Sequence, residues 1–148
     1  MAGHAQSRIA YSVGRLDRAV RQRLGEVTSR FGLTVAQYTA LSVLASRGSL
    51  SNAQLARRSF VTPQAMNEIV AAMADKAILA RAPDARHGRI VRISLTRKGG
   101  RVLRQCDAAA RRVEEEMLAG LPRGKREMLR ALLLTCVAAL EHRSMPRH

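Results

Sequence analysis

The sequence predicts a mainly α-helical fold with a small β-hairpin, a winged helix-turn-helix, as a single domain over residues 1–148. Two short helices with clear capping signals fall between residues 51 and 77, and an alternating strand with a basic loop follows at 83–95. The chain is also strongly basic. A helix-turn-helix places its second helix in the major groove of DNA, so this fold class already indicates a function class.

The chain before this motif is expected to begin with one long amphipathic helix over residues 7–31. Its apolar side chains recur at steps of three or four residues, which keeps them on one stripe. They are Ile9, Val13, Leu16, Val20, Leu24, Val27 and Phe31. Gly32 is expected to end this helix in a left-handed conformation. Thr34 and Gln37 then have the spacing of a capping box, which opens a second helix that Gly48 closes.

The helix pair of the motif is predicted from its start signals. Ser51 and Gln54 form another capping box, in which a hydroxyl caps the first free amides and the glutamine reaches back. Thr62 is a good N-cap, and Pro63 suits the first helical turn because its missing N–H is not needed there. The connecting residues 58–61 are few enough to set the two helices at an angle.

The second helix of the pair is expected to have one buried face and one polar face. Met66, Ile69, Val70, Met73 and Ala77 recur at helical spacing and are predicted to pack in the core. The outward positions near the start of the helix are Gln64, Asn67, Glu68 and Ala71. Gln and Asn can form paired hydrogen bonds with adenine, and recognition helices read bases with their N-terminal residues. The alternative is a solvated polar face on an ordinary surface helix.

A β-hairpin wing is predicted after the helix pair. Residues 79–81 and the alternating run 90–95 flank a polar loop at 83–89, and residues 49–51 are expected to add a minor strand. One face of the second strand is expected to pack on the helices; its residues are Val91, Ile93 and Leu95. The loop around Gly88 carries three basic or titratable residues, Arg86, His87 and Arg89.

The wing loop has two interpretations. An arginine at its tip can enter the minor groove, where a narrow A·T-rich groove strengthens the negative potential. The alternative is a solvent-exposed hairpin whose charges serve solubility alone.

The charge balance favours a polyanionic partner. The chain has 26 Lys and Arg against 11 Asp and Glu, a formal net charge of +15. Residues 47–104 alone carry twelve basic and three acidic side chains, a balance of +9. Such a charge suits nucleic acid or an anionic membrane surface. Arginine accounts for 23 of the basic residues, which a genome-wide compositional bias would also produce.

Several function classes are disfavoured. The sequence has no signal-peptide pattern and no apolar run near the ~20 residues that cross a bilayer, so we expect a cytoplasmic protein. The histidines are scattered and the two cysteines have no metal-ligand spacing, so no metal or cofactor is expected. A hydrolase or transferase would need convergent titratable residues, whereas the acids here are few and spread out, so we do not expect an enzyme.

The two ends of the chain are expected to form a homodimer. Thr96 caps a long helix with an apolar stripe, and Pro122 starts a last helix that is apolar on more than one face. No further chain covers these surfaces, so residues 7–31 and 100–143 are predicted to be dimerisation helices around a DNA-binding part at 34–99. Cys106 and Cys136 lie on apolar stripes and are predicted to be core residues. The sequence gives no signal for redox activity of either cysteine.

The order and spacing of these strings resemble the MarR family of winged-helix transcriptional regulators. The resembling segments are 33–41, 51–56, 61–66 and 83–99, and the likeness covers essentially the whole chain. The resemblance implies a dimer on a palindromic operator, usually a repressor, which a small aromatic or phenolic ligand commonly weakens. It also implies that Tyr11, Arg15 and Tyr38 are the candidates to line a ligand pocket near the first two helices.

Carried over by position, the resemblance implies that Thr62, Pro63, Gln64 and Asn67 lie in the major groove and that Arg89 is the wing arginine. Together with the motif and wing residues Ser51, Arg86 and His87, they form the predicted DNA-contacting set. One departure concerns the wing: many members have an Asp two residues before the wing arginine, where this chain has His87. Asp84 is present nearby and is interpreted as a turn residue. A nonspecific DNA-architectural protein is the alternative function, since it would share the same charge.

Overall fold

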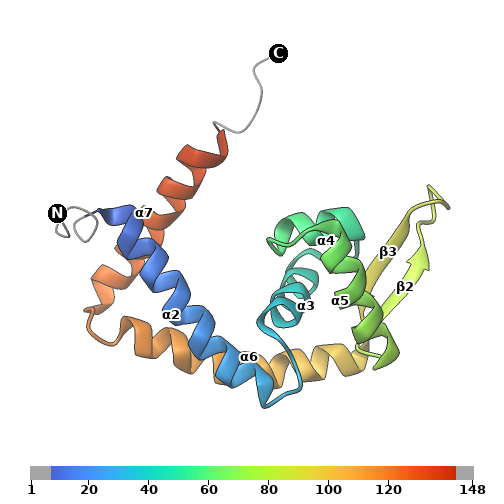
Figure 1. The fold of residues 1–148 in the computed structure, drawn as a ribbon, viewed down its shortest axis with the longest axis horizontal. Helices are drawn as coiled ribbons and strands as arrows, with labels where there is room; N and C mark the ends of the chain where they lie inside the picture. The colour runs from blue at the N-terminus through green and yellow to red at the C-terminus, as the bar shows by residue number, and fades with distance from the viewer. Residues whose placement is uncertain (1–7, 143–148) are drawn as a thin grey trace. The chain divides into compact units, whose positions relative to one another are not determined.

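The computed structural model describes residues 8–142 of the chain (Figure 1). They form two compact units that meet between Val113 and Glu114. The helices are α2 (Ile9–Ser29), α3 (Val35–Arg47), α4 (Asn52–Arg58), α5 (Pro63–Asp75), α6 (Arg97–Leu118) and α7 (Arg123–Glu141). The strands are β1 (Leu50–Ser51), β2 (Leu79–Pro83) and β3 (Val91–Leu95). His4, His148 and the predicted outermost helix residues 7 and 143 lie outside the described part.

The helix-turn-helix and the wing are both present as predicted. Helices α4 and α5 follow each other across a short turn, and β2 and β3 form a hairpin that extends beyond the helices of the first unit (Figure 1). The strands make one antiparallel sheet in the order β1-β3-β2, with Leu50 opposite Ile93 and Leu79 opposite Leu95. The short strand β1 therefore joins the start of α4 to the wing.

One apolar core holds the first unit together. Its fully buried large side chains come from α3, α4, α5, β3 and α6, and they include Leu41, Leu55, Met66, Met73, Ile93 and Cys106. Burial of side chains of this size contributes roughly 1.5–3 kcal/mol each relative to exposure. The core thus fixes both helices of the motif and the root of the wing against the same set of neighbours.

The predicted ends of α3 are confirmed, whereas α2 ends at Ser29 rather than at residue 31. Thr34 accepts a hydrogen bond from the Gln37 amide while the Gln37 side chain accepts from the Thr34 amide, which completes the capping box. Gly32 and Gly48 both have positive φ angles, 69° and 77°, a conformation that costs glycine little because it lacks a Cβ atom.

Three sequence predictions are wrong in detail. Ala77 is exposed rather than part of the core, because α5 ends at Asp75 and Ala77 turns the chain at a φ of 58°, leaving the buried place to Ile78. Val91 is exposed because its part of β3 extends beyond the helices. Cys136 is exposed in the single chain, whereas Cys106 is buried as expected, with burial raising its thiol pKa to about 11.

The terminal helices leave large apolar surfaces uncovered. No residue of α7 is buried, and Val27 and Thr28 are the buried residues of α2. The exposed apolar side chains on these two helices are Ile9, Tyr11, Val13, Leu16, Met128, Leu132, Leu133, Leu134, Val137 and Leu140. A single chain therefore exposes the apolar side chains of α7 and of the first half of α2, as predicted for dimerisation. Val27 of α2 and the α6 residues Leu103, Cys106, Ala110 and Val113 are instead buried within the single chain.

The junction between the wing and α6 depends on a close approach of two backbones. The Thr96 hydroxyl donates to the Ala77 carbonyl at 2.6 Å and accepts from the Gly99 amide at 3.0 Å. A Cβ atom on Gly99 would lie 2.2 Å from the Ile78 carbonyl oxygen, well inside contact distance. Glycine at this position is therefore a packing requirement.

We predict that Gly99→Ala destabilises the fold while its neighbour tolerates the same change. The added methyl must push α6 away from Ile78, and overpacking of this kind costs about 1–3 kcal/mol. In Gly100→Ala the nearest atom is the flexible end of Arg104 at 3.4 Å, so stability should stay within about 1 kcal/mol of the parent. Thermal unfolding of both variants tests this, and equal melting temperatures would contradict it.

Candidate nucleic-acid interface

The start of α5 is fixed by local caps and by a bond to the preceding helix. The Thr62 hydroxyl accepts from the Ala65 amide at 3.1 Å, and Pro63 occupies the first helical turn. The Asn52 amide nitrogen donates to the Pro63 carbonyl at 3.0 Å, which ties the beginnings of α4 and α5 together. The direction of α5 is therefore set at its first residue as well as by the core.

The outward face of α5 is polar, as the periodicity predicted. Met66, Val70 and Met73 are buried, so Gln64, Asn67 and Glu68 on the other face are exposed. Gln64 and Asn67 each carry an amide with donors and an acceptor, the groups that pair with an adenine edge. Both lie in the first two turns of the helix, where recognition helices meet bases.

Two residues of the predicted DNA-contacting set, Ser51 and Thr62, have hydroxyls at helix N-termini. Ser51 accepts from the Gln54 amide at 3.3 Å, as Thr62 does from Ala65. In each case the hydroxyl oxygen is the acceptor, so the hydroxyl hydrogen is left to donate outward. A donor at the positive end of a helix is a favourable place for a phosphate oxygen.

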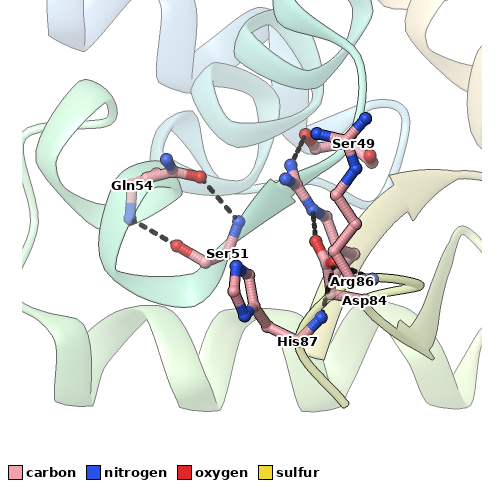
Figure 2. A network of polar contacts seen from close by, with 7 residues as sticks. Ser49, Ser51, Gln54, Asp84, Arg86 and His87 are labelled. Atoms are coloured by element: carbon pink, nitrogen blue, oxygen red, sulfur yellow. Dashed lines mark hydrogen bonds and ion pairs between the residues drawn. The ribbon is translucent and has the colours of Figure 1, made fainter. Parts of the chain in front are cut away.

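The wing loop is closed by one carboxylate (Figure 2). Asp84 accepts from the backbone amides of Arg86 at 2.7 Å and His87 at 3.1 Å, which folds the loop back on itself. Backbone bonds between Asp84 and Ile90 at 2.7 Å, and between Ile90 and His87 at 2.8 Å, complete the turn. The loop thus has a defined backbone before any ligand binds.

The same carboxylate also holds an arginine on β3. Arg92 donates with Nε to Asp84 at 2.6 Å and with Nη1 to the Ser49 carbonyl at 3.0 Å. Hydrogen bonds from Arg92 and from the two loop amides lower the pKa of Asp84 to about 2, so this group stays ionised through the neutral range. Asp84 is therefore more than a turn residue.

The tip of the wing presents cationic and donor groups to solvent. Within residues 8–142 the side chains of Arg86, His87 and Arg89 are exposed and form no hydrogen bond or ion pair. The nearby carboxylate of Asp84 is bonded to Arg92 rather than to Arg89. Arg89 is thus available to an anionic partner.

The structure does not bring the predicted ligand residues together within one chain. Tyr38 is half-buried between α3 and α6, where its hydroxyl donates to Asp107 at 2.5 Å, and burial together with this carboxylate raises the Tyr38 pKa. Tyr11 and Arg15 are exposed on α2, about three to four helical turns before Gly25, where α2 contacts α3.

Two residues that shape this interface are not among those predicted from the sequence. Asn52 lies within the Ser51–Gln54 capping box and Arg92 within the alternating run 90–95, and neither pattern gives the side chain a partner. Their roles depend on partners eleven and forty-three positions away, Pro63 and Ser49. An arginine eight residues after an Asp, across a hairpin loop, is the one local signal that was present.

This geometry defines a class of protein, a winged helix-turn-helix that binds duplex DNA, and comparisons with known proteins agree with it. A sequence profile of the MarR family matches residues 31–90. HTH-type transcriptional repressor Rv2887 of Mycobacterium tuberculosis is 31% identical over 113 residues, which cover 76% of this chain and 81% of that relative. HTH-type transcriptional regulator MT0903.1 of the same species is 31% identical over 125 residues, or 84% and 85% of the two chains.

Solved structures lead to the same family. The crystal structure of MarR family protein Rv2887 with salicylic acid has a TM-score of 0.75 at 27% identity, covering 92% of this chain and 99% of that one. Its complex with DNA has a TM-score of 0.74 at 26% identity, covering 88% and 98%. Apo MarR from E. coli, at 19% identity and a TM-score of 0.78, shows the shared fold. The chain belongs to the MarR family of transcriptional regulators.

Among residues 8–142 no helix is both long and apolar enough to cross a membrane. No group of three or more His, Cys, Asp or Glu side chains in that range is arranged to hold a metal ion.

Proposed function

We propose that this protein is a homodimeric repressor that binds a palindromic DNA operator and is released from it by a small aromatic ligand. The observation that carries the proposal is the outward polar face at the start of α5 beside a wing with three uncommitted basic or donor side chains. It acts in the cytoplasm as a binding protein, and no catalytic residue enters this account.

Three kinds of DNA contact are assigned to different residues. Gln64 and Asn67 read base edges in the major groove, with Thr62 and Pro63 at the helix start against its wall. Ser51 donates to a phosphate, and Arg86 and His87 add phosphate contacts from the wing. Arg89 enters the minor groove, where A·T-rich sequence strengthens the negative potential.

Base reading is tested by Gln64→Ala and Asn67→Ala. Each variant should lose about 1–3 kcal/mol on the cognate operator and little on unrelated duplex, because a paired hydrogen bond to one base is removed. Fluorescence anisotropy on both duplexes measures the difference. Glu68→Ala, on the same exposed face, is the control that should not lose operator preference. A nonspecific architectural protein would lose affinity equally on all sequences or not at all.

The homodimer is supported by the uncovered apolar side chains of α2 and α7. Large exposed apolar surfaces of this kind mark interaction sites, and a second copy provides the matching surface by symmetry. It also gives the two recognition helices that a palindromic operator needs, with half-sites ~10 bp apart. Residues 7–31 and 100–143 are then the dimerisation helices around the DNA-binding part at 34–99.

We predict that Leu133→Asp dissociates the dimer. A charge placed in an apolar interface should raise the dimer dissociation constant by roughly 100-fold, because the carboxylate loses water without gaining a partner. Thr135→Asp adds the same charge at a polar, exposed position of α7 and is the control. Sedimentation equilibrium distinguishes the two variants, and a parent protein that sediments as a monomer would overturn the proposal.

The ligand response is supported by the relative solved with salicylic acid. In this chain Tyr38 is half-buried and its hydroxyl donates a hydrogen bond to Asp107. Tyr11 and Arg15 lie near the N-terminal end of α2, several turns before the part of α2 that contacts α3. Tyr11 and Arg15 therefore reach a ligand beside Tyr38 only when the second copy of the dimer brings them there. A carboxylate on the ligand would pair with Arg15.

Salicylate should release the protein from its operator, and Arg15→Ala should weaken that release. The variant removes the cation that would pair with the salicylate carboxylate, so a higher salicylate concentration should be needed to release half of the protein. Arg18→Ala on the same helix is the control, and both variants should bind the operator with similar affinity when salicylate is absent. Competition anisotropy with both variants measures this. Identical salicylate curves for the two variants would exclude Arg15 from the site.

A further inference from the structure

The Asp84–Arg92 pair links the wing loop to Ser49, directly before β1 and the helix-turn-helix. This link is additional to the backbone pairing of the strands. We propose that Asp84 and Arg92 are positioning residues that hold the wing at a fixed place relative to the start of α5, and so set how strongly the protein distinguishes DNA flanking its recognition sequence. This inference rests on the proposed function, because it assigns the wing to flanking DNA.

The loop side of this link is the Asp84 carboxylate. It accepts three hydrogen bonds, from the Arg86 amide at 2.7 Å, the His87 amide at 3.1 Å and Arg92 Nε at 2.6 Å (Figure 2). Carboxylates that accept this many bonds hold their donors in one geometry. Arg86 and His87, which carry two of the DNA-contacting side chains, thus have their backbones fixed by Asp84.

The helix side is reached through a single guanidinium. Arg92 uses Nε for Asp84 and Nη1 for the Ser49 carbonyl, which lies directly before β1. The planar fork of arginine can make both bonds at once, whereas a lysine ammonium is a point charge without this fixed geometry. The loop and the strand that leads into α4 are therefore held by one rigid group.

The link continues to the recognition helix. Three residues after Ser49, Asn52 donates to the Pro63 carbonyl at 3.0 Å at the first turn of α5. A continuous path of hydrogen bonds and short backbone segments thus runs from the wing loop through Arg92 to the start of α5. Both DNA-reading elements then approach the duplex at a set distance, which is what lets one protein read a core and its flanks together.

A wing that acted only through its net charge would respond to the loss of the Asp84 charge in the opposite way to a wing that Asp84 positions. Asp84 is a negative charge beside the DNA-contacting loop, so its neutralisation should tighten binding to any duplex if the wing acted only through its net charge. If Asp84 positions the wing, Asp84→Asn should instead weaken operator binding and reduce the preference for A·T-rich over G·C-rich flanks.

The experiment compares Asp84→Asn and Arg92→Lys with Asp75→Asn, which makes the same charge change at an exposed site outside the link. Operator affinity is measured by anisotropy on duplexes with one core and either flank. We expect both link variants to lose the flank preference by roughly tenfold, and the double variant to lose no more than either alone. Asp75→Asn should keep the preference of the parent.

Tighter binding by Asp84→Asn with an unchanged flank preference would overturn the inference, as would additive losses in the double variant. Amide hydrogen exchange of the free protein measures the order of the wing loop without DNA. The Arg86 and His87 amides should exchange faster in Asp84→Asn, and unchanged protection would also overturn the proposal. A parent protein that shows no operator preference would instead refute the proposed function and leave the exchange result to decide the link.

Discussion

Burial of one face of α5 is the constraint on which the rest of the interface depends. Met66, Val70 and Met73 have to lie in the core, and on a helix this forces Gln64 and Asn67 to face solvent. Three buried side chains of this size contribute roughly 1.5–3 kcal/mol each, which far exceeds any cost of leaving two amides in water. The polar face is therefore a consequence of packing, and it is already formed in the free protein.

The wing is held by a different kind of interaction. Its root is apolar, through Ile93 and Leu79, whereas the part beyond the helices has exposed apolar residues and depends on hydrogen bonds to Asp84. A basic loop of this kind would repel itself and sample many shapes if no carboxylate closed it. Since Asp84 neutralises Arg92 and leaves Arg89 uncommitted, one acid organises the loop without reducing the charge at its tip.

Much of this architecture could be predicted from the sequence because its signals are local. The capping boxes at Thr34 and Ser51 and the Thr62-Pro63 helix start act over a few residues and are confirmed. The second wing strand is present as well, although only Ile93 of its predicted packed face is fully buried. Ala77 was misplaced because periodicity continues past the point where a left-handed residue ends the helix. The bonds from Asn52 to the Pro63 carbonyl and from Arg92 to the Ser49 carbonyl join segments eleven and forty-three positions apart, so no local pattern along the chain contains them.

The central claim, a sequence-specific DNA-binding regulator, is tested most directly with the parent protein and a duplex from upstream of its own gene. Fluorescence anisotropy would be followed across a salt series with scrambled duplex as competitor. We expect tight binding that survives the competitor, with a steep salt dependence from roughly 6–10 neutralised phosphates per dimer. Binding that scrambled DNA removes equally well would contradict it, and would leave a basic protein that holds DNA through charge alone.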